Sequence, residues 1–325
     1  MPQIMVEHLR KTFQVPIRKG GGLLGMLNRQ YREVHAVEDV SFAIEAGEMI
    51  GYLGPNGAGK STTLKMLTGI LVPSGGRIDV AGRSPANQRI EHARQIGVVF
   101  GQRTQLWWDL PTIESFELLR HIYRIPLDRW QRNLKIFSDL LDLEPFLATP
   151  VRQLSLGQRM RAELSAALLH DPKILFLDEP TIGLDVVARE RIRGFLQQLN
   201  REYGVTVILT THDLGDVERL CQRILLIDHG RVIYDGALEA LRNRLGRWRT
   251  LVVDLDGVET VQVPHAELMR QEGPRAWLRF DREQISAAAL ISDVAARYPV
   301  RDLTLEEPEI EGIVRDIYAH GIEQA

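Results

Sequence analysis

A glycine-rich stretch that ends at Ser61 constrains the fold of this chain more than any other feature. It reads Gly54-Pro55-Asn56-Gly57-Ala58-Gly59-Lys60-Ser61 and matches the pattern G-x-x-x-x-G-K-S. The apolar run at 49–53 before it predicts a strand, and the stretch 62–71 after it predicts a helix. In that context, N–H groups of the loop and of the helix N-terminus bind phosphate oxygens. A plain glycine-rich turn is the alternative, and the flanking elements argue against it.

The residue types in this loop predict distinct roles at a bound nucleotide. Lys60 is expected to pair with the β- and γ-phosphates, and Ser61 to ligate Mg²⁺. The other residues expected to contact the nucleotide lie in the loop or directly after it: Gly54, Asn56, Gly57, Ala58, Gly59 and Thr62. The segment therefore predicts a site for a nucleoside triphosphate with its metal ion.

Two carboxylates follow a second apolar run. Residues 174–177 predict a buried strand, and Asp178 and Glu179 come directly after it. Ligands bind at the carboxyl ends of strands in open parallel sheets, so both carboxylates are expected at such a site. Asp178 is the expected residue of the Mg²⁺ sphere, and Glu179 is the candidate base for the attacking water. A helix cap or a solvated turn is the ordinary alternative for an acidic pair, and the phosphate loop upstream favours the catalytic interpretation.

Composition and charge exclude several classes of protein. Of the 325 residues, 44% are hydrophobic and 26% are charged, which argues against a disordered, collagen-like or membrane-embedded chain. A net charge of -3 gives no overall reason to expect a nucleic-acid partner. Cys221 is the only cysteine, so no internal disulfide requires an oxidising compartment. The sequence contains neither a signal peptide nor a long apolar run, so we expect another polypeptide to cross any membrane at which it works.

Short apolar runs alternate with helical periodicity, which predicts an α/β fold with parallel strands and crossover helices. Strands are expected at 1–13, 37–44, 49–53, 174–177, 205–209, 224–228 and 231–234, the last two as a hairpin. Helices are expected at 62–71, 113–123, 130–141, 155–170 and 187–203. Residues 14–34 predict an inserted loop with a short amphipathic helix, on which Leu23, Leu27 and Tyr31 share one face.

The pattern changes after Leu241, which predicts a second domain. Strands are expected there at 250–255, 258–263, 276–280 and 300–305, and helices at 285–297 and 309–320. We therefore expect an α/β domain at 1–240, with a helical subdomain at about 104–170, and a small α+β domain at 241–325.

The segment Leu154-Ser155-Leu156-Gly157-Gln158 lies between the phosphate loop and the two carboxylates. With it, the chain resembles the ATP-binding subunit of an ABC transporter, and the order of motifs matches that family over about residues 3–240. Leu156 departs from the family's signature, which usually has glycine there. The resemblance implies a P-loop ABC nucleotide-binding domain, ATP and Mg²⁺ as its ligands, and ATP hydrolysis as its reaction.

The resemblance also assigns roles to residues whose surroundings alone say little. Gln102 resembles the Q-loop glutamine, with a catalytic role and a Mg²⁺ contact; His212 resembles the catalytic switch histidine, and Phe13 the aromatic residue that stacks on adenine. The signature and the D-loop imply further nucleotide-binding residues: Ser155, Gly157, Gln158 and Asp185. Structural alternatives remain, because Ser155 with Gln158 fits a capping box, and His212 and Phe13 are compatible with structural positions.

Partners and cargo follow from the same resemblance. In this family the signature of one subunit faces the phosphate loop of another, so a second nucleotide-binding subunit, with a homodimer expected, is implied together with transmembrane permease subunits. Trp107 and Trp108 are candidates for the permease contact, with core packing as the alternative. The segment 302–311 resembles the accessory domain of ATPases that serve ABC-2-type exporters.

These resemblances imply an ATPase at the cytoplasmic face of the cell membrane that drives export of a drug-like or lipidic compound. Polysaccharide export is the alternative within the class. ABC ATPases that act on ribosomes or DNA are a different class: those resembling translation factors carry two motif sets in one chain, and repair ATPases separate their motifs by long coiled coils. This sequence has neither feature, and we expect no nucleic-acid partner.

Overall fold

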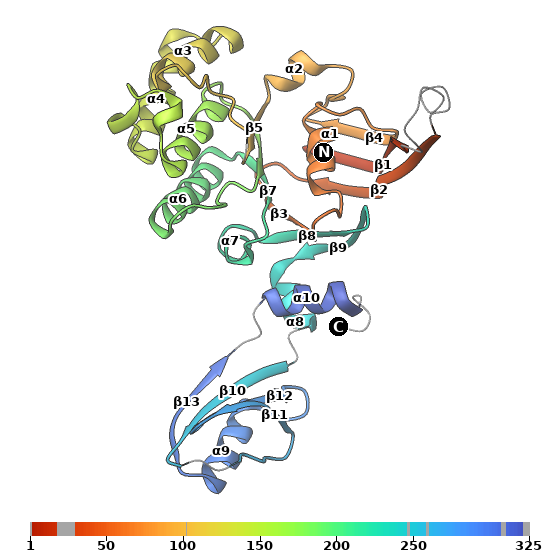
Figure 1. Ribbon diagram of the computed structural model, residues 1–325, viewed down its shortest axis with the longest axis vertical. Helices are drawn as coiled ribbons and strands as arrows, with labels where there is room; N and C mark the ends of the chain where they lie inside the picture. The colour runs from red at the N-terminus through yellow and green to blue at the C-terminus, as the bar shows by residue number, and fades with distance from the viewer. Residues whose placement is uncertain are drawn as a thin grey trace, which may run out of the picture. The chain divides into compact units, whose positions relative to one another are not determined.

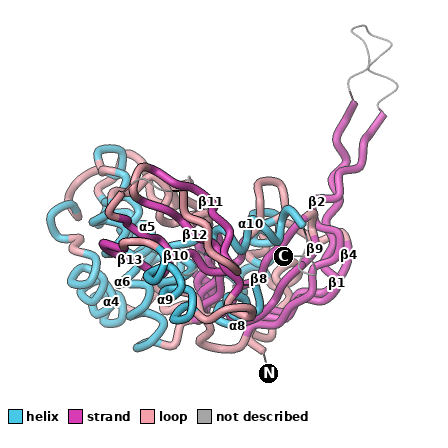
Figure 2. Tube along the Cα trace, turned by 90° about the horizontal axis from the view of Figure 1, so that it is seen from below, coloured by secondary structure: helices cyan, strands magenta, loops and turns pink. Residues whose placement is uncertain are grey.

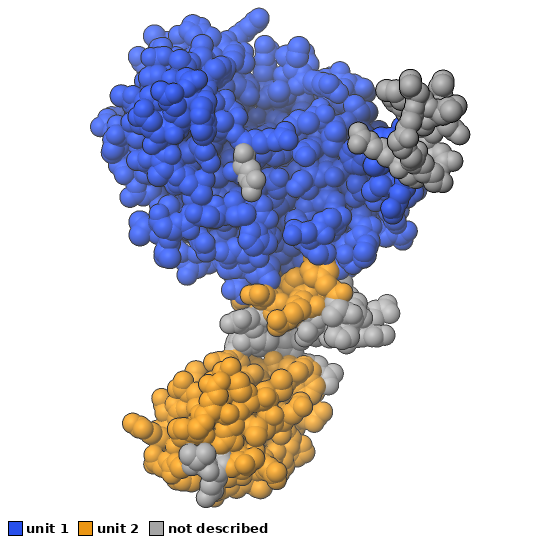
Figure 3. Space-filling view, in the orientation of Figure 1, with its two compact units in different colours: residues 1–235 blue, residues 236–325 orange. Residues whose placement is uncertain are grey.

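The computed structural model describes residues 2–17, 30–101, 103–245, 248–257, 260–306 and 310–320. The chain divides into two compact units, Met1–Asp235 and Gly236–Ala325, which Figure 3 shows in different colours. Each unit has a hydrophobic core of its own. The nucleotide motifs all lie in the first unit.

The first unit is built on a mixed sheet. Within the described residues its nine strands lie in the order β4-β1-β2-β9-β8-β3-β7-β6-β5. The strands are β1 (Ile4–Ile17), β2 (Gln30–Ile44), β3 (Met49–Leu53), β4 (Gly75–Val80), β5 (Ile96–Phe100), β6 (Ile174–Asp178), β7 (Thr206–Thr210), β8 (Arg223–Asp228) and β9 (Arg231–Ala237). Because β8, β3, β7, β6 and β5 pair in parallel, their carboxyl ends meet at one end of the sheet. The strands expected at 49–53, 174–177 and 205–209 are confirmed to within a residue or so.

Helices surround this sheet, with α3, α4, α5 and α6 grouped at one side in Figure 1. The helices of the unit are α1 (Lys60–Leu67), α2 (Arg89–Ala93), α3 (Thr112–Tyr123), α4 (Leu127–Leu141), α5 (Leu156–Leu168), α6 (Val186–Tyr203) and α7 (Leu214–Leu220), with 3₁₀ turns η2 (Glu144–Phe146) and η3 (Val151–Gln153). α3 and α4 pack on α5, and α5 packs on β5. Sequence patterns did not indicate β4, α2 or β5. These elements are short, and β4 exposes much of its length, so their periodicity is weak.

Two long antiparallel strands occupy much of the segment for which a loop was expected. β1 and β2 stay paired from Ile4 with Ile44 to Ile17 with Gln30, so 14–17 and 30–34 are strand. In Figure 2 this ribbon projects from the rest of the sheet. The expectation of a loop is therefore wrong for these residues.

The helix expected in the same segment is also wrong at Tyr31, which lies on β2. Leu23 and Leu27, the other residues of its apolar face, lie outside the described residues. The physical reason for the error is that Val15, Ile17 and Val34 continue the alternation of the flanking strands. β-branched residues with a period of two favour strand pairing over a turn.

The second unit is an antiparallel sheet with a helix packed on one face. Its described strands lie in the order β11-β12-β10-β13, with bounds β10 (Trp248–Leu255), β11 (Ala266–Glu272), β12 (Arg275–Asp281) and β13 (Val300–Glu306). Its helices are α8 (Leu238–Leu245), α9 (Ala287–Arg297) and α10 (Ile310–His320). Leu290 and Val294 of α9 join Leu251, Leu278 and Phe280 of the sheet in one core.

One strand expected in this unit is wrong. In the described part of 258–263, residues 260–263 form no strand, although Val261 and Val263 are buried in the core. These two valines alternate with polar residues because their side chains enter the core from an irregular segment, not because the segment pairs with a strand. The strand β11, which follows at Ala266–Glu272, was not expected, because an edge strand with polar, half-exposed side chains gives little apolar signal.

Candidate active site

Close backbone approaches explain the glycines in the loop after β3. A Cβ at Gly54 would lie 2.5 Å from the carbonyl oxygen of Ile227, and a Cβ at Gly59 would lie 2.5 Å from that of Ala36. Gly59 also precedes α1 with φ 104, a conformation that L side chains rarely adopt. The loop is therefore wrapped tightly, and it presents the free N–H groups of the first turn of α1 at the carboxyl end of β3.

Lys60 begins α1, and its ammonium group bonds to the loop itself. Nζ donates to the carbonyl oxygens of Gly54 at 2.5 Å and Pro55 at 3.1 Å. Burial lowers the pKa of Lys60, while the neighbouring carboxylates Glu179 and Asp178 raise it. A partly desolvated cation in this position is suited to bind a phosphate group, which brings more negative charge than the carbonyls it replaces.

The two carboxylates follow directly from the parallel strands. Asp178 is the last residue of β6, and its Oδ1 accepts a hydrogen bond of 2.6 Å from the hydroxyl of Thr210, the last residue of β7. Glu179 has φ 56, and its N–H donates to the carbonyl oxygen of Thr210 at 2.9 Å. Left-handed backbone at a non-glycine residue costs free energy and is found most often where function requires it.

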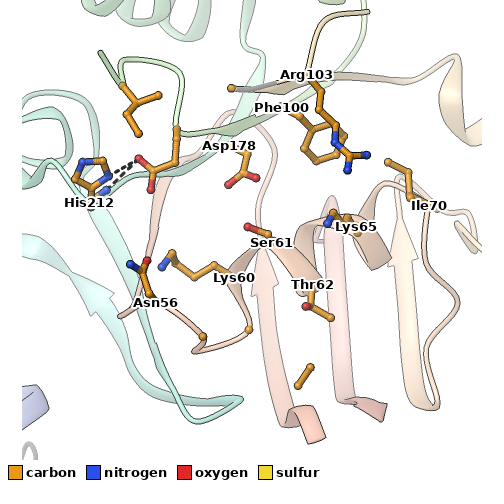
Figure 4. A pocket seen from close by; sticks show the side chains of 16 residues that line it. Asn56, Lys60, Ser61, Thr62, Lys65, Ile70, Phe100, Arg103, Asp178 and His212 are labelled. Carbon is orange, nitrogen blue, oxygen red and sulfur yellow. Dashed lines mark hydrogen bonds and ion pairs between the residues drawn. The ribbon is translucent and has the colours of Figure 1, made fainter. Parts of the chain in front are cut away.

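His212 contacts Glu179. Figure 4 draws dashed lines from the labelled His212 to a neighbouring carboxylate. The ring Nδ1 of His212 lies 2.7 Å from Oε2 of Glu179, and the backbone N–H of His212 donates to the same oxygen at 3.4 Å. The histidine side chain is 66% exposed, whereas the glutamate side chain is 24% exposed. The histidine therefore holds a half-buried carboxylate from its solvent side, an arrangement that can orient a base for proton transfer.

One cavity of about 880 Å³ collects these side chains, which is within the size range of ligand pockets. The residues of its lining that were predicted from the sequence are Asn56, Gly57, Gly59, Lys60, Ser61, Thr62, Asp178, Glu179 and His212. Ser61 supplies a hydroxyl and Asp178 a carboxylate, and oxygen donors of this kind fit Mg²⁺. The cavity thus combines groups suited to bind phosphate, to ligate Mg²⁺ and to accept a proton.

Several lining residues were not predicted. They are Ala36, Lys65, Ile70, Phe100, Gly101, Arg103 and Ile182. The sequence could have predicted the two cations among them. Lys65 lies three residues after Thr62 on α1 and therefore near it on the helix surface, and Arg103 adjoins Gln102. Gln102 itself lies outside the described residues, between two residues that line the cavity.

Other predicted residues do not line the cavity. Gly54 and Ala58 support the loop, and Ala58 is buried. Phe13 lies on β1 opposite Val34, and the Nζ of Lys11 is 5.1 Å from its ring centre. The structure does not bring Phe13 into the lining, so adenine stacking on this ring stays a prediction.

The signature residues begin α5. Ser155 and Gln158 form a capping box, in which the Ser155 Oγ accepts from the Gln158 N–H at 3.2 Å and the Gln158 side chain accepts from the Ser155 N–H at 2.9 Å. Asp185 caps α6 by accepting from the N–H of Ala188 at 2.8 Å. None of these residues, nor Gly157, lines the cavity of its own chain. The capping-box interpretation is therefore confirmed, and it leaves both helix starts at the surface.

A buried ion pair joins α6 and α7. Asp216 of α7 is fully buried; its Oδ1 accepts from the Nε of Arg193 on α6 at 2.6 Å, and its Oδ2 accepts from the hydroxyl of Thr181. Thr181 lies two residues after Glu179, and Asp216 lies four residues after His212. Asp216 therefore links the segment after Glu179, through Thr181, to Arg193 of α6. Asp216 itself belongs to the segment that follows His212.

Known proteins are similar to this chain in sequence and in fold. A profile of the ABC transporter family matches residues 37–182. The ABC transporter ATP-binding protein NatA of Bacillus subtilis is 38% identical over 208 residues, covering 64% of this chain and 84% of that protein. The Nod factor export ATP-binding protein I of Burkholderia pseudomallei is 34% identical over 291 residues, covering 86% of this chain and 93% of that protein. The dimeric ATP-binding cassette MJ0796, solved in a post-hydrolysis state bound to ADP and Pi, is 27% identical with a TM-score of 0.61, covering 72% of this chain and 98% of that one.

The phosphate loop, the paired carboxylates and the parallel sheet define a P-loop ATPase with the ABC fold. With relatives matched over most of their length, the chain belongs to the ATP-binding subunits of ABC transporters. The resemblance inferred from its motifs is thereby confirmed, and so is its assignment as an ATPase. None of the helices in the described ranges has both the length and the apolar character needed to span a bilayer.

Proposed function

We propose that this chain hydrolyses ATP in the cavity around Lys60 and that hydrolysis drives export through a membrane permease. The observation that carries the catalytic part is the pair Glu179 and His212, 2.7 Å apart in one cavity with Asp178 and the phosphate loop. The export part is supported by a relative that is named for Nod factor export and is matched over 93% of its length.

The side chains of the cavity divide the reaction among them. Lys60 exchanges its two carbonyl partners for the β- and γ-phosphate oxygens. Ser61 and Asp178, with Gln102 by proposal, would hold Mg²⁺, which would neutralise part of the phosphate charge. Glu179 accepts the proton of the attacking water, and His212 orients that carboxylate. Each step uses a group that already faces the cavity or adjoins it.

We infer that the complete site forms between two copies of the chain. The signature residues and Asp185 are absent from the lining of their own cavity, yet Ser155 starts an exposed, capped helix. A helix N-terminus of this kind offers N–H groups and a positive dipole end to an anion, which suits it to a γ-phosphate bound by another copy. The dimeric state of the MJ0796 cassette supports a homodimer of the same kind.

The permease is proposed to bind beside the helical subdomain, at the cytoplasmic face of the membrane. Trp107 and Trp108 are 38% and 47% exposed, which argues against the alternative of core packing. The guanidinium of Arg159 lies 5.7 Å from the ring centre of Trp108. Exposed Trp and Arg side chains are frequent at the centres of protein interfaces. An ABC-2-type permease and a drug-like or lipidic cargo are the finer part of the proposal, and they rest on the resemblance of 302–311.

Replacing Glu179 by Gln tests the catalytic assignment. The variant keeps the size and polarity of the side chain but removes the base, so the ATPase rate should fall by about 100-fold or more while ATP affinity is retained. Steady-state ATPase assays and nucleotide binding by fluorescence titration check this. Glu202→Gln, on the exposed end of α6, is the matched control and should keep the parent rate. A parent rate in Glu179→Gln would contradict the assignment.

A further inference from the structure

A second cavity in the first unit shares no residue with the nucleotide site. It has a volume of about 370 Å³ and is lined by parts of α4 and α6, by the turn after β2 and by the segments that precede β6 and β7. Lys173 and Val205 come directly before β6 and β7, so this cavity lies at the amino ends of those strands. The nucleotide cavity lies at their carboxyl ends, beside Asp178. We call the second space the α4 cavity.

The wall of the α4 cavity is largely apolar. It includes Ile136 and Phe137 of α4, Leu168 of α5, Leu199 of α6 and Val205. Phe137, Leu168, Leu199 and Val205 are buried, so they belong to fixed packing rather than to a mobile surface. A wall of this kind binds an apolar body through contact and exclusion of water.

Most polar groups of the α4 cavity are already bonded to other parts of the protein. The amide nitrogen of Asn133 donates to the carbonyl oxygen of Leu169 at 3.0 Å and to the Oδ1 of Asp171 at 2.7 Å. The side-chain oxygen of Gln3 accepts from the hydroxyl of Thr206 at 2.6 Å. These groups therefore shape the cavity and have little capacity left for a ligand.

Lys173 is the one cation among the described residues of the lining. Its side chain is exposed and forms no hydrogen bond or ion pair with any residue in the described part of the chain. The one carboxylate of the lining, Asp171, is engaged by Asn133 and lies 3.7 Å from Arg129 and 3.6 Å from Arg132. The described lining thus combines one unpaired cation with a largely apolar wall.

We propose that the α4 cavity binds a small organic anion whose apolar body fills the cavity and whose acidic group pairs with Lys173. The volume falls in the range of pockets that hold small molecules. An acyl chain with a carboxylate and an aromatic acid share this chemistry. Because the site has no residue in common with the nucleotide cavity, the anion binds together with ATP rather than in competition with it.

The test uses the full chain and two probes, 8-anilinonaphthalene-1-sulfonate for the aromatic case and laurate for the acyl case. The sulfonate should bind saturably with one site per chain, seen as a rise in its fluorescence, and laurate should displace it if acyl chains are accepted. If laurate does not displace the sulfonate, the site accepts aromatic acids but not acyl chains. In that case the variants described below must still weaken binding of the sulfonate. A non-hydrolysable ATP analogue should leave the dissociation constant unchanged.

Three variants locate the binding. Lys173→Gln removes the charge and should weaken binding of the sulfonate about tenfold, as expected for the loss of one hydrogen bond to a charged group. Lys135→Gln changes an exposed lysine of α4 that does not line the cavity, and it should bind as the parent does. Ile136→Trp fills the cavity and should abolish saturable binding, with its thermal unfolding midpoint confirming that it is folded.

The proposal is wrong if the sulfonate shows no saturable site, if the ATP analogue displaces it, or if Lys173→Gln binds as tightly as the parent chain. Lys173 is on the surface, so its variant decides the question even if Ile136→Trp does not fold. These outcomes are independent of ATP hydrolysis, because binding is measured without turnover. Failure here would leave the proposed function of the Lys60 cavity unaffected.

Discussion

The two ends of strands β6 and β7 carry cavities with different side chains. At the carboxyl ends, the carboxylates of Asp178 and Glu179 join the phosphate loop and His212 in one cavity. At the amino ends, helices α4 and α6 enclose a largely apolar space with one free cation among its described side chains, that of Lys173. Each of these strands is only five residues long, so one short, rigid strand reaches from one cavity to the other. These parallel strands thus separate the nucleotide cavity, which has charged side chains, from the α4 cavity, whose wall is mainly apolar.

Backbone conformation differs between the two ends in the same way. The nucleotide end holds Gly59 at φ 104 and Glu179 at φ 56, both beside groups that act on phosphate in our proposal. The amino end holds Gly204 at φ 64, where the residue ends α6, and Asp171 at φ 57 in the turn after α5. In the first case the unusual φ places functional groups, and in the second it only terminates a helix. The comparison predicts that substitutions at the two ends fail for different reasons.

The largest effect on stability is expected from Asp216→Ala at the nucleotide end. This change removes the fully buried partner of Arg193 and leaves its buried guanidinium with the more exposed carboxylates Glu190 and Asp213, so it should cost about 3 kcal/mol, the lower end of the range for breaking a buried ion pair. The free energy of unfolding, measured by urea titration, should fall by that amount. ATPase activity should also fall, because Thr181 loses its partner two residues after Glu179, the proposed base.

The matched control for this variant is Glu190→Ala. Glu190 also pairs with Arg193, at 2.6 Å, but its side chain is 47% exposed. An exposed pair contributes about 1 kcal/mol or less, so this variant should stay close to the parent. Equal losses in the two variants would show that burial does not distinguish the two partners of Arg193, and that the nucleotide end is not stabilised by its buried charges.

Sequence reasoning succeeded at the nucleotide end because its residues lie in continuous motifs. Lys60, Ser61, Asp178 and Glu179 each adjoin a buried strand or a helix start, and topology then brings them together. Expectations for Phe13 and for the signature residues came from resemblance. The described residues of a single chain do not place any of them in the cavity.

Sequence reasoning missed the α4 cavity for a physical reason. Its lining comes from segments that are far apart in the sequence, such as those of Gln3 and Val205. No local sequence pattern distinguishes an apolar side chain that lines a cavity from one that packs against another side chain. The same limit explains the wrong strand at 258–263, where Val261 and Val263 are buried without being paired. The periodicity of apolar residues indicates which side chains are buried. It identifies a strand only when the buried segment also pairs with another strand.

A second prediction concerns pH and the amino end. His170, which follows α5, stacks on Tyr123 with ring centres 4.0 Å apart, and its Nε2 donates to the carbonyl oxygen of Ile96. Burial lowers the pKa of His170 to about 4, and it outweighs the hydrogen bond to Ile96 and the charge of Asp171, both of which raise the pKa. Between pH 6.5 and 4 the unfolded chain therefore binds a proton that the folded chain does not, and stability falls as pH falls through that window.

His170→Phe should remove this loss, which amounts to about 3 kcal/mol below pH 4 since each pKa unit is worth about 1.4 kcal/mol. Urea unfolding at pH 7, 6, 5 and 4 would show a flatter profile for the variant than for the parent. His121→Phe, at an exposed position on α3, is the control and should keep the parent profile. A parent-like profile in His170→Phe would mean that this histidine does not make the amino end acid-sensitive.

The smallest effect is expected at Gly204, which lines the α4 cavity and ends α6 at φ 64. A Cβ there would meet nothing within 4 Å, whereas one at Gly59 would lie 2.5 Å from a backbone oxygen. Gly204→Ala should therefore cost only the left-handed conformation, about 1–2 kcal/mol, and Gly204→Asn should cost less because asparagine tolerates that region. Thermal and urea unfolding measure both, and ATPase activity should match the parent. If the two variants are equally destabilised by much more than this, the space beside Gly204 is filled by packing, and the α4 cavity is not open at that wall.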